Sequence, residues 1–332
     1  MSVSFKFVAI VFCSIMIFGS LPIKADGLNF RKYAGEFMEI GVDARAQSMG
    51  GAFTAVSGDV VSTYYNPAGI YDLNNTQISF MHTQQMIASV NYDFLAVGKR
   101  QGENRVIAVS LVRLGIDNIK DSRQAYRQVQ QTGDWNIDWS KIKEFNASDY
   151  IFTLSVAQKW VKDWNFGANL KLIRRNLADH HANGLGFDLG AQKKIFENAQ
   201  VGLAFRNITT TLISWDTGEK ELVKPSLYLG ATYFLNIPGL KSSIQPVGDI
   251  ILRAENRNKS ATVNSGAFSA DFAAGLEYTY HNVLFIRGGI DEISRLNLGA
   301  GVQIPHIRID YAFTSYDYEI GNSHRIGLLI DL

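Results

Sequence analysis

Hydrophobic and polar side chains alternate from residue 76 to the end of the chain, in short runs separated by turn residues. In residues 268–279 one face carries Phe268, Phe272, Leu276 and Tyr278, and the other carries Ser269, Asp271 and Glu277. A period of two residues is typical of a β-strand that has one apolar and one polar face. The pattern therefore predicts an all-β architecture.

Fourteen such runs can be counted, most of them near the roughly 9 to 11 residues that a tilted membrane strand needs. The predicted strands are residues 76–84, 88–98, 105–114, 148–159, 164–175, 184–193, 199–208, 224–234, 243–253, 268–279, 283–289, 296–303, 307–314 and 324–332. An even number of strands is the rule for single-chain bacterial outer-membrane barrels.

The connections between these strands alternate in length. The short ones are residues 99–104, 160–163, 194–198, 235–242, 280–282 and 304–306, and the long ones include 115–147, 209–223, 254–267 and 315–323. Short turns at one rim and long loops at the other are typical of outer-membrane barrels. A soluble sandwich also alternates apolar and polar faces, but it has no reason to separate its connections by length. We therefore predict a transmembrane antiparallel β-barrel of about 14 strands.

Residues 37–70 follow neither the strand period nor a helical stripe, and they contain the pair Gly50-Gly51. Each Gly in a helix interior costs about 1 kcal/mol relative to Ala, which disfavours a long helix. Asn66-Pro67 indicates a turn, because a residue before Pro avoids helical angles. A barrel of this size is wider than its own side chains can fill. We therefore predict that this segment is a hatch in the lumen, anchored by Arg45 to carboxylates of the wall.

The first residues have the features of a secretory signal peptide. Lys6 precedes an apolar run from Phe7 to Phe18, and small residues follow up to Ala25. The run is shorter than the roughly 20 apolar residues of a spanning helix. The predicted organisation is a signal peptide at 1–25, a leader and hatch at 26–72, and an outer-membrane barrel at 73–332.

Charge and cysteine content exclude several classes of function. The charged fraction is 19%, below the quarter or so of an average soluble domain. Without Lys6 and Lys24, 32 − 2 = 30 basic residues face 31 acidic ones, which leaves no basic field for nucleic acid. The only cysteine, Cys13, lies in the predicted signal peptide, so the mature chain would have no thiolate site. We expect no cofactor and no metal site.

The residues also favour a protein that is not an enzyme. The six histidines lie at predicted strand ends or connections, and no Gly-x-Ser-x-Gly motif is present. Charges predicted to face the lumen are expected to pair across strands or to hold the hatch, because unpaired buried charge is costly. These residues are Lys171, Asp188, Arg206, Asp271, Glu277, Arg308 and Asp310.

Three tryptophans in the long connections are candidates for binding a partner, since large aromatic side chains often dominate interfaces. They are Trp135 and Trp139 in residues 115–147 and Trp215 in residues 209–223. The alternative is that they pack each loop against itself.

The predicted hatch resembles a known family. The runs EIGVDARAQSMGGAFTAV at 39–56 and YYNPAG at 64–69 are similar to the N-terminal signature of the PorV/PorQ family, with Arg45, Gly50, Gly51, Asn66, Pro67 and Gly69 as its positions here. That family belongs to the FadL-like superfamily of fourteen-stranded outer-membrane proteins with an N-terminal hatch. The last strands, from Asn297 onward, are also similar to the end of the family's barrel.

The resemblance implies a non-enzymatic role in type IX protein secretion, as a cargo-shuttling or surface-attachment component in the outer membrane of a Bacteroidota-like Gram-negative cell. The implied partners are outer-membrane lipid, translocon or attachment-complex proteins, exported cargo and the barrel-assembly machinery. The assembly signal would consist of Arg325, Gly327, Ile330 and Leu332, with Leu in place of the common final Phe. Asn-Pro-Ala is shared with FadL-like channels, so the alternative is a channel for uptake of hydrophobic small molecules.

Overall fold

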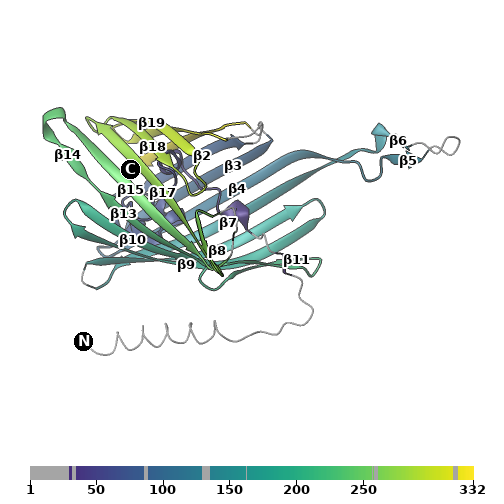
Figure 1. Cartoon of the computed structure of the whole chain (residues 1–332), viewed down its shortest axis with the longest axis horizontal. Coiled ribbons are helices and arrows are strands. Elements are labelled where there is room, and N and C mark those ends of the chain that lie inside the picture. The colour runs from purple at the N-terminus through teal and green to yellow at the C-terminus, as the bar shows by residue number, and fades with distance from the viewer. Residues whose placement is uncertain are drawn as a thin grey trace, which may run out of the picture.

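In the computed structural model, fourteen antiparallel strands close into a barrel (Figure 1). The structure describes residues 30–31, 35–85, 89–128, 135–161, 163–255, 257, 261–316 and 321–332. The wall strands are β2 (Gln77–Gln85), β3 (Val90–Gln101), β4 (Arg105–Asp121), β7 (Lys143–Lys159), β8 (Trp164–Leu177), β9 (His180–Phe196), β10 (Ala199–Arg206), β13 (Ser226–Tyr233), β15 (Ser242–Arg253), β17 (Phe268–Tyr280), β18 (Leu284–Ile290), β19 (Leu296–Ile304), β20 (Ile307–Thr314) and β21 (Ser323–Asp331).

Each wall strand pairs with the wall strands before and after it in the sequence. The barrel closes where β2 pairs with β21, with Gln77 opposite Asp331 and Gln84 opposite His324. All fourteen predicted strands are present, one for one. The prediction of an antiparallel barrel with a hatch in its lumen is confirmed.

Shorter strands lie at the rims of the wall. They are β1 (Phe30–Arg31), β5 (Tyr126–Gln128), β6 (Trp135–Ile137), β11 (Thr211–Trp215), β12 (Lys220–Val223), β14 (Leu235–Ile237) and β16 (Val263–Ser265), and two 3-10 helices, η3 (Trp139–Lys141) and η4 (Pro238–Leu240), accompany them. β1 pairs in parallel with β12.

The interpretation of residues 115–147 as a loop is wrong for most of that range. β4 and β7 remain paired as far as Asp121 and Lys143, and they form an arm that carries β5 and β6 beyond the rim (Figure 1). The sequence pattern missed this extension because both faces of the arm are solvated, so the apolar alternation stops while the backbone ladder continues. Residues 209–223, also predicted as a loop, contain the β11–β12 hairpin. One face of this hairpin is buried, through residues such as Thr211 and Ile213, but its strands are only five and four residues long.

The outer surface of the wall is apolar. Neighbouring outward residues such as Leu95, Leu111 and Phe152 are each more than a third exposed, and they lie directly opposite one another on β3, β4 and β7. An apolar band of this kind suits the hydrocarbon layer of a bilayer. In the described part of the chain, no helix is long and apolar enough to cross a membrane.

The hatch is a set of short helical turns inside the barrel, seen as the purple segment in Figure 1. Its elements are η1 (Glu36–Met38), α2 (Ala44–Ser48), α3 (Ser62–Tyr65) and η2 (Pro67–Asp72). α2 ends at Ser48, and Gly50 just beyond its cap has a left-handed φ of 69°, which suits glycine. η2 begins because the Asn66 side chain accepts a bond from Ala68 N and Pro67 occupies the first turn.

The predicted signal peptide and most of the predicted leader lie outside the described residues. Burial is nearly continuous from Phe37 to Leu73, which is the segment predicted as the hatch with three residues added at its end.

Candidate functional site

Seven wall glycines bring the hatch into direct contact with the barrel backbone. These collar glycines are Gly167, Gly190, Gly202, Gly230, Gly275, Gly289 and Gly299. A Cβ atom on any of them would lie less than 3.0 Å from atoms of hatch residues 48–68, closer than real Cβ atoms approach. The collar therefore lets hatch and wall pack backbone to backbone, where any side chain would force them apart.

An ion-pair network, here called the ionic latch, joins the hatch to β17, β18 and β20. Its members are Arg45 and Asp59 of the hatch and Glu277, Arg287, Arg308 and Asp310 of the wall. Three arginines thus face three carboxylates in a buried space. Such a network is stabilising only when every charge has a partner.

Arg45 makes the central contact of the latch. Its Nε and Nη2 atoms donate to the two carboxylate oxygens of Glu277, both at 2.8 Å. Its Nη1 atom donates to Asp59 at 3.2 Å. A bidentate guanidinium–carboxylate pair fixes orientation as well as distance, so Arg45 holds α2 in one position relative to β17.

Asp43 is a fourth acid beside the latch, and it titrates near neutrality. Burial raises the pKa of Asp43 to about 7, and the nearby carboxylates of Asp59 and Asp310 add to the effect. Burial acts on Asp59 in the same direction, but Arg308 and Arg45 outweigh it and lower the pKa of the Asp59 carboxyl. Protonation of Asp43 therefore balances the local charge.

Hydrogen bonds with wall side chains, without ion pairs, hold another part of the hatch. Asp249 of β15 accepts from the backbone N–H groups of Phe53 and Thr54, both at 3.1 Å, and from the Thr54 hydroxyl at 2.7 Å. Gln192 of β9 donates to the carbonyl of Thr54 at 2.8 Å. These side chains satisfy backbone groups that the turns of the hatch leave unpaired.

The opposite side of the hatch is apolar. Val60, Ile70 and Leu73 are fully buried and belong to the same hydrophobic cluster as Phe94 and Val106 of β3 and β4. Contact between hydrocarbon groups excludes water on this side. Hydrogen bonds add to it, including one from Arg100 of β3 to the Leu73 carbonyl at 2.9 Å and one from the Val60 N–H to Gln77 of β2 at 3.0 Å.

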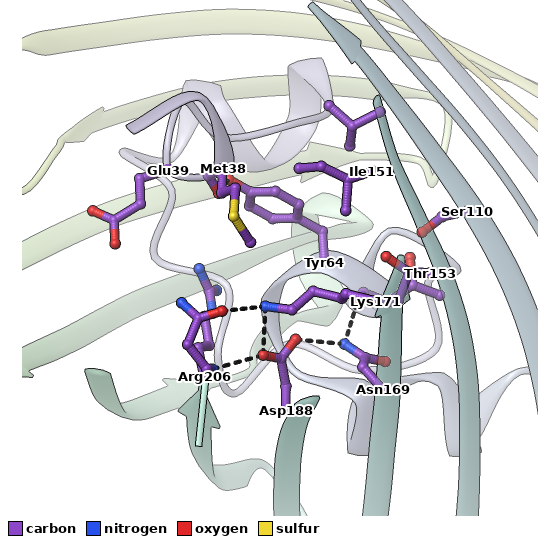
Figure 2. Close-up of a pocket in the computed structure, with 13 residues that line it drawn as sticks. Met38, Glu39, Tyr64, Ser110, Ile151, Thr153, Asn169, Lys171, Asp188 and Arg206 are labelled. Carbon is purple, nitrogen blue, oxygen red and sulfur yellow. Dashed lines mark hydrogen bonds and ion pairs between the residues drawn. The ribbon is translucent and has the colours of Figure 1, made fainter. Parts of the chain in front are cut away.

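A small cavity lies between the hatch and the long-loop rim (Figure 2). Its volume of about 30 Å³ is enough for two or three water molecules, at about 10–15 Å³ each. Apolar groups of Met38, Tyr64 and Ile151 face the pair Lys171–Asp188, whose Nζ and Oδ1 atoms are 2.6 Å apart. This upper cavity therefore has one apolar and one charged side.

A larger cavity of about 440 Å³ lies on the turn side of the hatch. It is bounded by hatch residues 55–57, by the β9–β10 turn and by polar side chains such as Gln200 and Gln245. The described hatch thus separates two cavities, a small upper one and a larger lower one.

The hatch residues predicted from sequence lie together inside the barrel, but they make different contacts. Gly50 contacts the wall, and its own Cβ would meet the carbonyl of Ile290, while Gly69 lies against Ser62 within the hatch. Asn66 donates to the carbonyls of Thr54 and Ala191 at 2.8 and 3.3 Å. Gly51, in the turn that follows α2, has a φ of 73°.

The three predicted tryptophans do not form one surface. Trp139 is 75% exposed on the arm, whereas Trp135 is placed only as part of β6. Trp215 is partly buried: its Nε1 atom donates to Glu221 at 2.8 Å, and Arg175 stacks on its ring. Trp215 therefore packs the β11–β12 hairpin against the wall.

The predicted assembly signal lies on β21 and at the end of the chain. Arg325 and Gly327 point into the lumen, Arg325 donates to the Thr314 hydroxyl, and Gly327 lies against Ala44 of the hatch. Ile330 faces outward, and Leu332 is 66% exposed.

Sequence reasoning missed Asp59, Arg287, Asp249 and the collar glycines as hatch contacts. A signal for the collar does exist, because glycines at inward positions of several strands are unusual where side chains must fill a core. The wall partner of Asp59, Arg308, and the hatch partner of Asp249, Thr54, lie more than 190 residues away from them in the chain, so no local pattern marks these contacts.

Comparison with solved structures reveals the same architecture in bacterial outer-membrane transporters. The toluene transporter TodX of Pseudomonas putida matches with a TM-score of 0.57 and 12% identity, over 88% of this chain and 99% of that one. The toluene transporter TbuX of Ralstonia pickettii gives 0.54 and 13%, over 87% and 97%. A FadL homologue of Pseudomonas aeruginosa gives 0.55 and 9%, over 87% and 98%.

No protein-family model and no curated protein matches the sequence. The chain therefore has the fold of the FadL-like outer-membrane barrels, as its resemblance to that superfamily implied. The narrower resemblance to the PorV/PorQ family stays a prediction.

Proposed function

We propose that the protein is an outer-membrane channel that takes up small hydrophobic molecules, with the hatch as its gate. The observation that carries the proposal is a hatch in the bore with a cavity on each side, in a fold shared with toluene transporters. A solute in the upper cavity would meet an apolar side formed by Met38, Tyr64 and Ile151. Since the upper cavity holds only about 30 Å³, uptake requires the hatch to move.

A disulfide between hatch and wall tests this requirement. A Cβ on Gly327 would lie 3.3 Å from the Cβ of Ala44, close to the roughly 3.5–4.5 Å spacing found in disulfides. Because Cys13 is the only native cysteine, the pair Ala44→Cys/Gly327→Cys would be the only pair in a chain cleaved at Ala25.

The measurement is the initial rate of radiolabelled toluene uptake by cells that lack the native gene and carry each variant. The oxidised double variant should lose at least about tenfold in rate, and a reductant should restore it. Ala44→Cys and Gly327→Cys alone are the matched controls. Equal uptake by cells with and without the protein would exclude a toluene channel.

A second candidate function is the type IX secretion role, favoured by the arm. Tyr126 and Trp139 are 58% and 75% exposed on a segment that projects beyond the rim (Figure 1), where an exported protein could bind. The implied translocon, cargo and assembly partners belong to this candidate.

Replacing residues 122–142 by a short Gly-Ser linker separates the two functions, since β4 and β7 stay paired up to Asp121 and Lys143. The channel function predicts unchanged toluene uptake and unchanged export of secreted proteins. Loss of export with normal uptake would favour the secretion role.

A further inference from the structure

A row of polar side chains interrupts the outer, lipid-facing surface of the barrel. His82, Asp93, Arg113, Tyr150 and Arg174 lie on the consecutive strands β2, β3, β4, β7 and β8. Each is the direct cross-strand partner of the next. We call this row the outer polar cluster.

The outer polar cluster is linked by contacts between its own members. His82 Nδ1 lies 2.6 Å from one oxygen of Asp93, and Arg113 Nη1 donates to the other at 3.1 Å. Tyr150 lies beside Arg113 as its direct cross-strand partner. Among the described residues, Arg174 donates to the uncharged amide oxygens of Asn183 at 3.0 Å and Asn176 at 3.2 Å.

The cluster lies directly above an apolar row. Two residues nearer the short turns, the same five strands present Phe80, Leu95, Leu111, Phe152 and Leu172, again as direct partners. All five are exposed on the outer surface. The boundary between apolar and polar surface is therefore sharp and crosses five strands at one register.

The apolar surface below this boundary is short on β2, whereas on β8 outward apolar residues run from Trp164 to Leu172. On β2 it comprises Ile78 and Phe80, and from Ile78 to His82 the strand rises by only about 13 Å at 3.3 Å per residue. On β17, by contrast, outward apolar residues run from Phe268 to Tyr280. A barrel's apolar band is about 25 Å tall, so at β2 the cluster lies within the height of that band and lipid polar groups must reach it there.

The charge of the cluster indicates which polar groups these are. Arg113 and Arg174 carry two positive charges against the single carboxylate of Asp93. The cluster lies toward the long-loop rim, which faces the outside in outer-membrane barrels, and the outer leaflet of that membrane is a phosphorylated glycolipid. A guanidinium matches phosphate with two parallel hydrogen bonds.

We propose that the outer polar cluster is a binding site for the phosphorylated headgroup of an outer-leaflet glycolipid, with Arg113 and Arg174 as the phosphate ligands. Asp93 positions Arg113 through their ion pair, and Tyr150 lies beside Arg113 on the next strand. Arg174 binds the phosphate with the donors that its amide partners leave free. The site is independent of the hatch and of the solute that the barrel carries.

The test uses the full barrel, purified in detergent and mixed with bisphosphorylated lipid A or with the same lipid after enzymatic dephosphorylation. Native mass spectrometry counts the lipids retained on each barrel. Wild type should keep bisphosphorylated lipid A and lose the dephosphorylated form. Arg113→Gln/Arg174→Gln should reduce retention by about tenfold or more, since each arginine–phosphate contact is charge-assisted.

Arg105→Gln is the matched control, because Arg105 is an exposed arginine at the opposite end of β4. It should retain lipid A like the wild type, and resistance to SDS without heating verifies that each variant is folded. Equal retention of both lipid forms, or equal loss in control and double variant, would overturn the proposal. So would a wild-type barrel that forms dimers through this face and keeps no lipid.

Discussion

The hatch is held in two different ways on its two sides. Toward β3 and β4 it is held mainly by apolar side chains such as Val60 and Leu73, which share one hydrophobic cluster with the wall, and by a hydrogen bond from Arg100 to the Leu73 carbonyl. Toward β17, β18 and β20 it is held by the ionic latch, through Arg45 and Asp59. The stabilisation from apolar contact is non-directional and depends on the buried area, whereas ion pairs also require a particular geometry. The apolar side therefore keeps the hatch inside, and the latch decides how it is oriented.

The largest effect on how the hatch is held is expected from Glu277→Ala, which removes a carboxylate of the ionic latch. Arg45 and Arg287 would then be buried without their shared carboxylate, which costs about 3–5 kcal/mol for a broken buried pair. We expect the hatch to loosen while the barrel still folds, so that cells become sensitive to large antibiotics such as vancomycin. Arg45→Ala should act in the same direction.

Removal of both partners gives the control. Arg45→Met/Glu277→Leu leaves Arg287 paired with Asp310 and should be less permeable than Glu277→Ala, because both members of the Arg45–Glu277 pair are gone. Equal vancomycin sensitivity in wild type and Glu277→Ala would contradict the role of the latch.

Filling the collar should have the next largest effect. Gly289→Ala places a methyl group against Met49 and Gly50, and overpacking a tight contact costs about 1–3 kcal/mol. Hydrogen exchange of the hatch amides should speed up accordingly. Gly248→Ala is the matched control, because its nearest neighbour would be 3.9 Å away. Similar exchange in the two variants would show that the collar does not seat the hatch.

The pH dependence of hatch stability tests the ionic side of the hatch, because Asp43 lies beside the latch. The pKa of Asp43 is raised to about 7 in the seated hatch, above its ordinary value near 4. The stabilisation of the seated hatch by protonated Asp43 is therefore fully present below about pH 4. It declines by up to about 1.4 kcal/mol per pH unit as the pH rises toward 7, and it is lost above that.

Asp43→Asn should remove this part of the pH dependence and keep the cap on α2, since Asn also caps helices and tolerates the positive φ of 68°. Hatch opening, measured by hydrogen exchange with its intrinsic pH dependence subtracted, should then change less between pH 5 and 8 than in the wild type. An identical pH profile in both proteins would argue against a raised pKa.

The smallest effect is expected on the apolar side. Ile70→Val removes one buried methylene from the hydrophobic cluster and should cost about 0.5–1.5 kcal/mol. Hatch exchange should rise by no more than about tenfold, with no change in vancomycin sensitivity. A leak as large as that of Glu277→Ala would mean that burial, and not the latch, sets the orientation of the hatch.

The sequence predicted the strands of the barrel wall better than the contacts that hold the hatch. The period-two pattern located all fourteen wall strands, because lipid on one face and lumen on the other impose alternation over a whole spanning segment. The pattern ended at Leu114, although β4 continues to Asp121, because the arm has solvent on both faces. Arg45 could be singled out from its motif, but its partner could not.

The sequence by itself determined that the chain is an all-β barrel with a non-strand segment to place in its bore, since alternation and composition follow from the solvent that each face meets. Only the tertiary structure decided that Arg45 meets Glu277 across 232 residues, that seven glycines form one collar, and that His82, Asp93 and Arg113 share one register on the outer wall. These relations depend on how distant strands are aligned, and strand alignment is a property of the closed sheet that no local run of residues encodes.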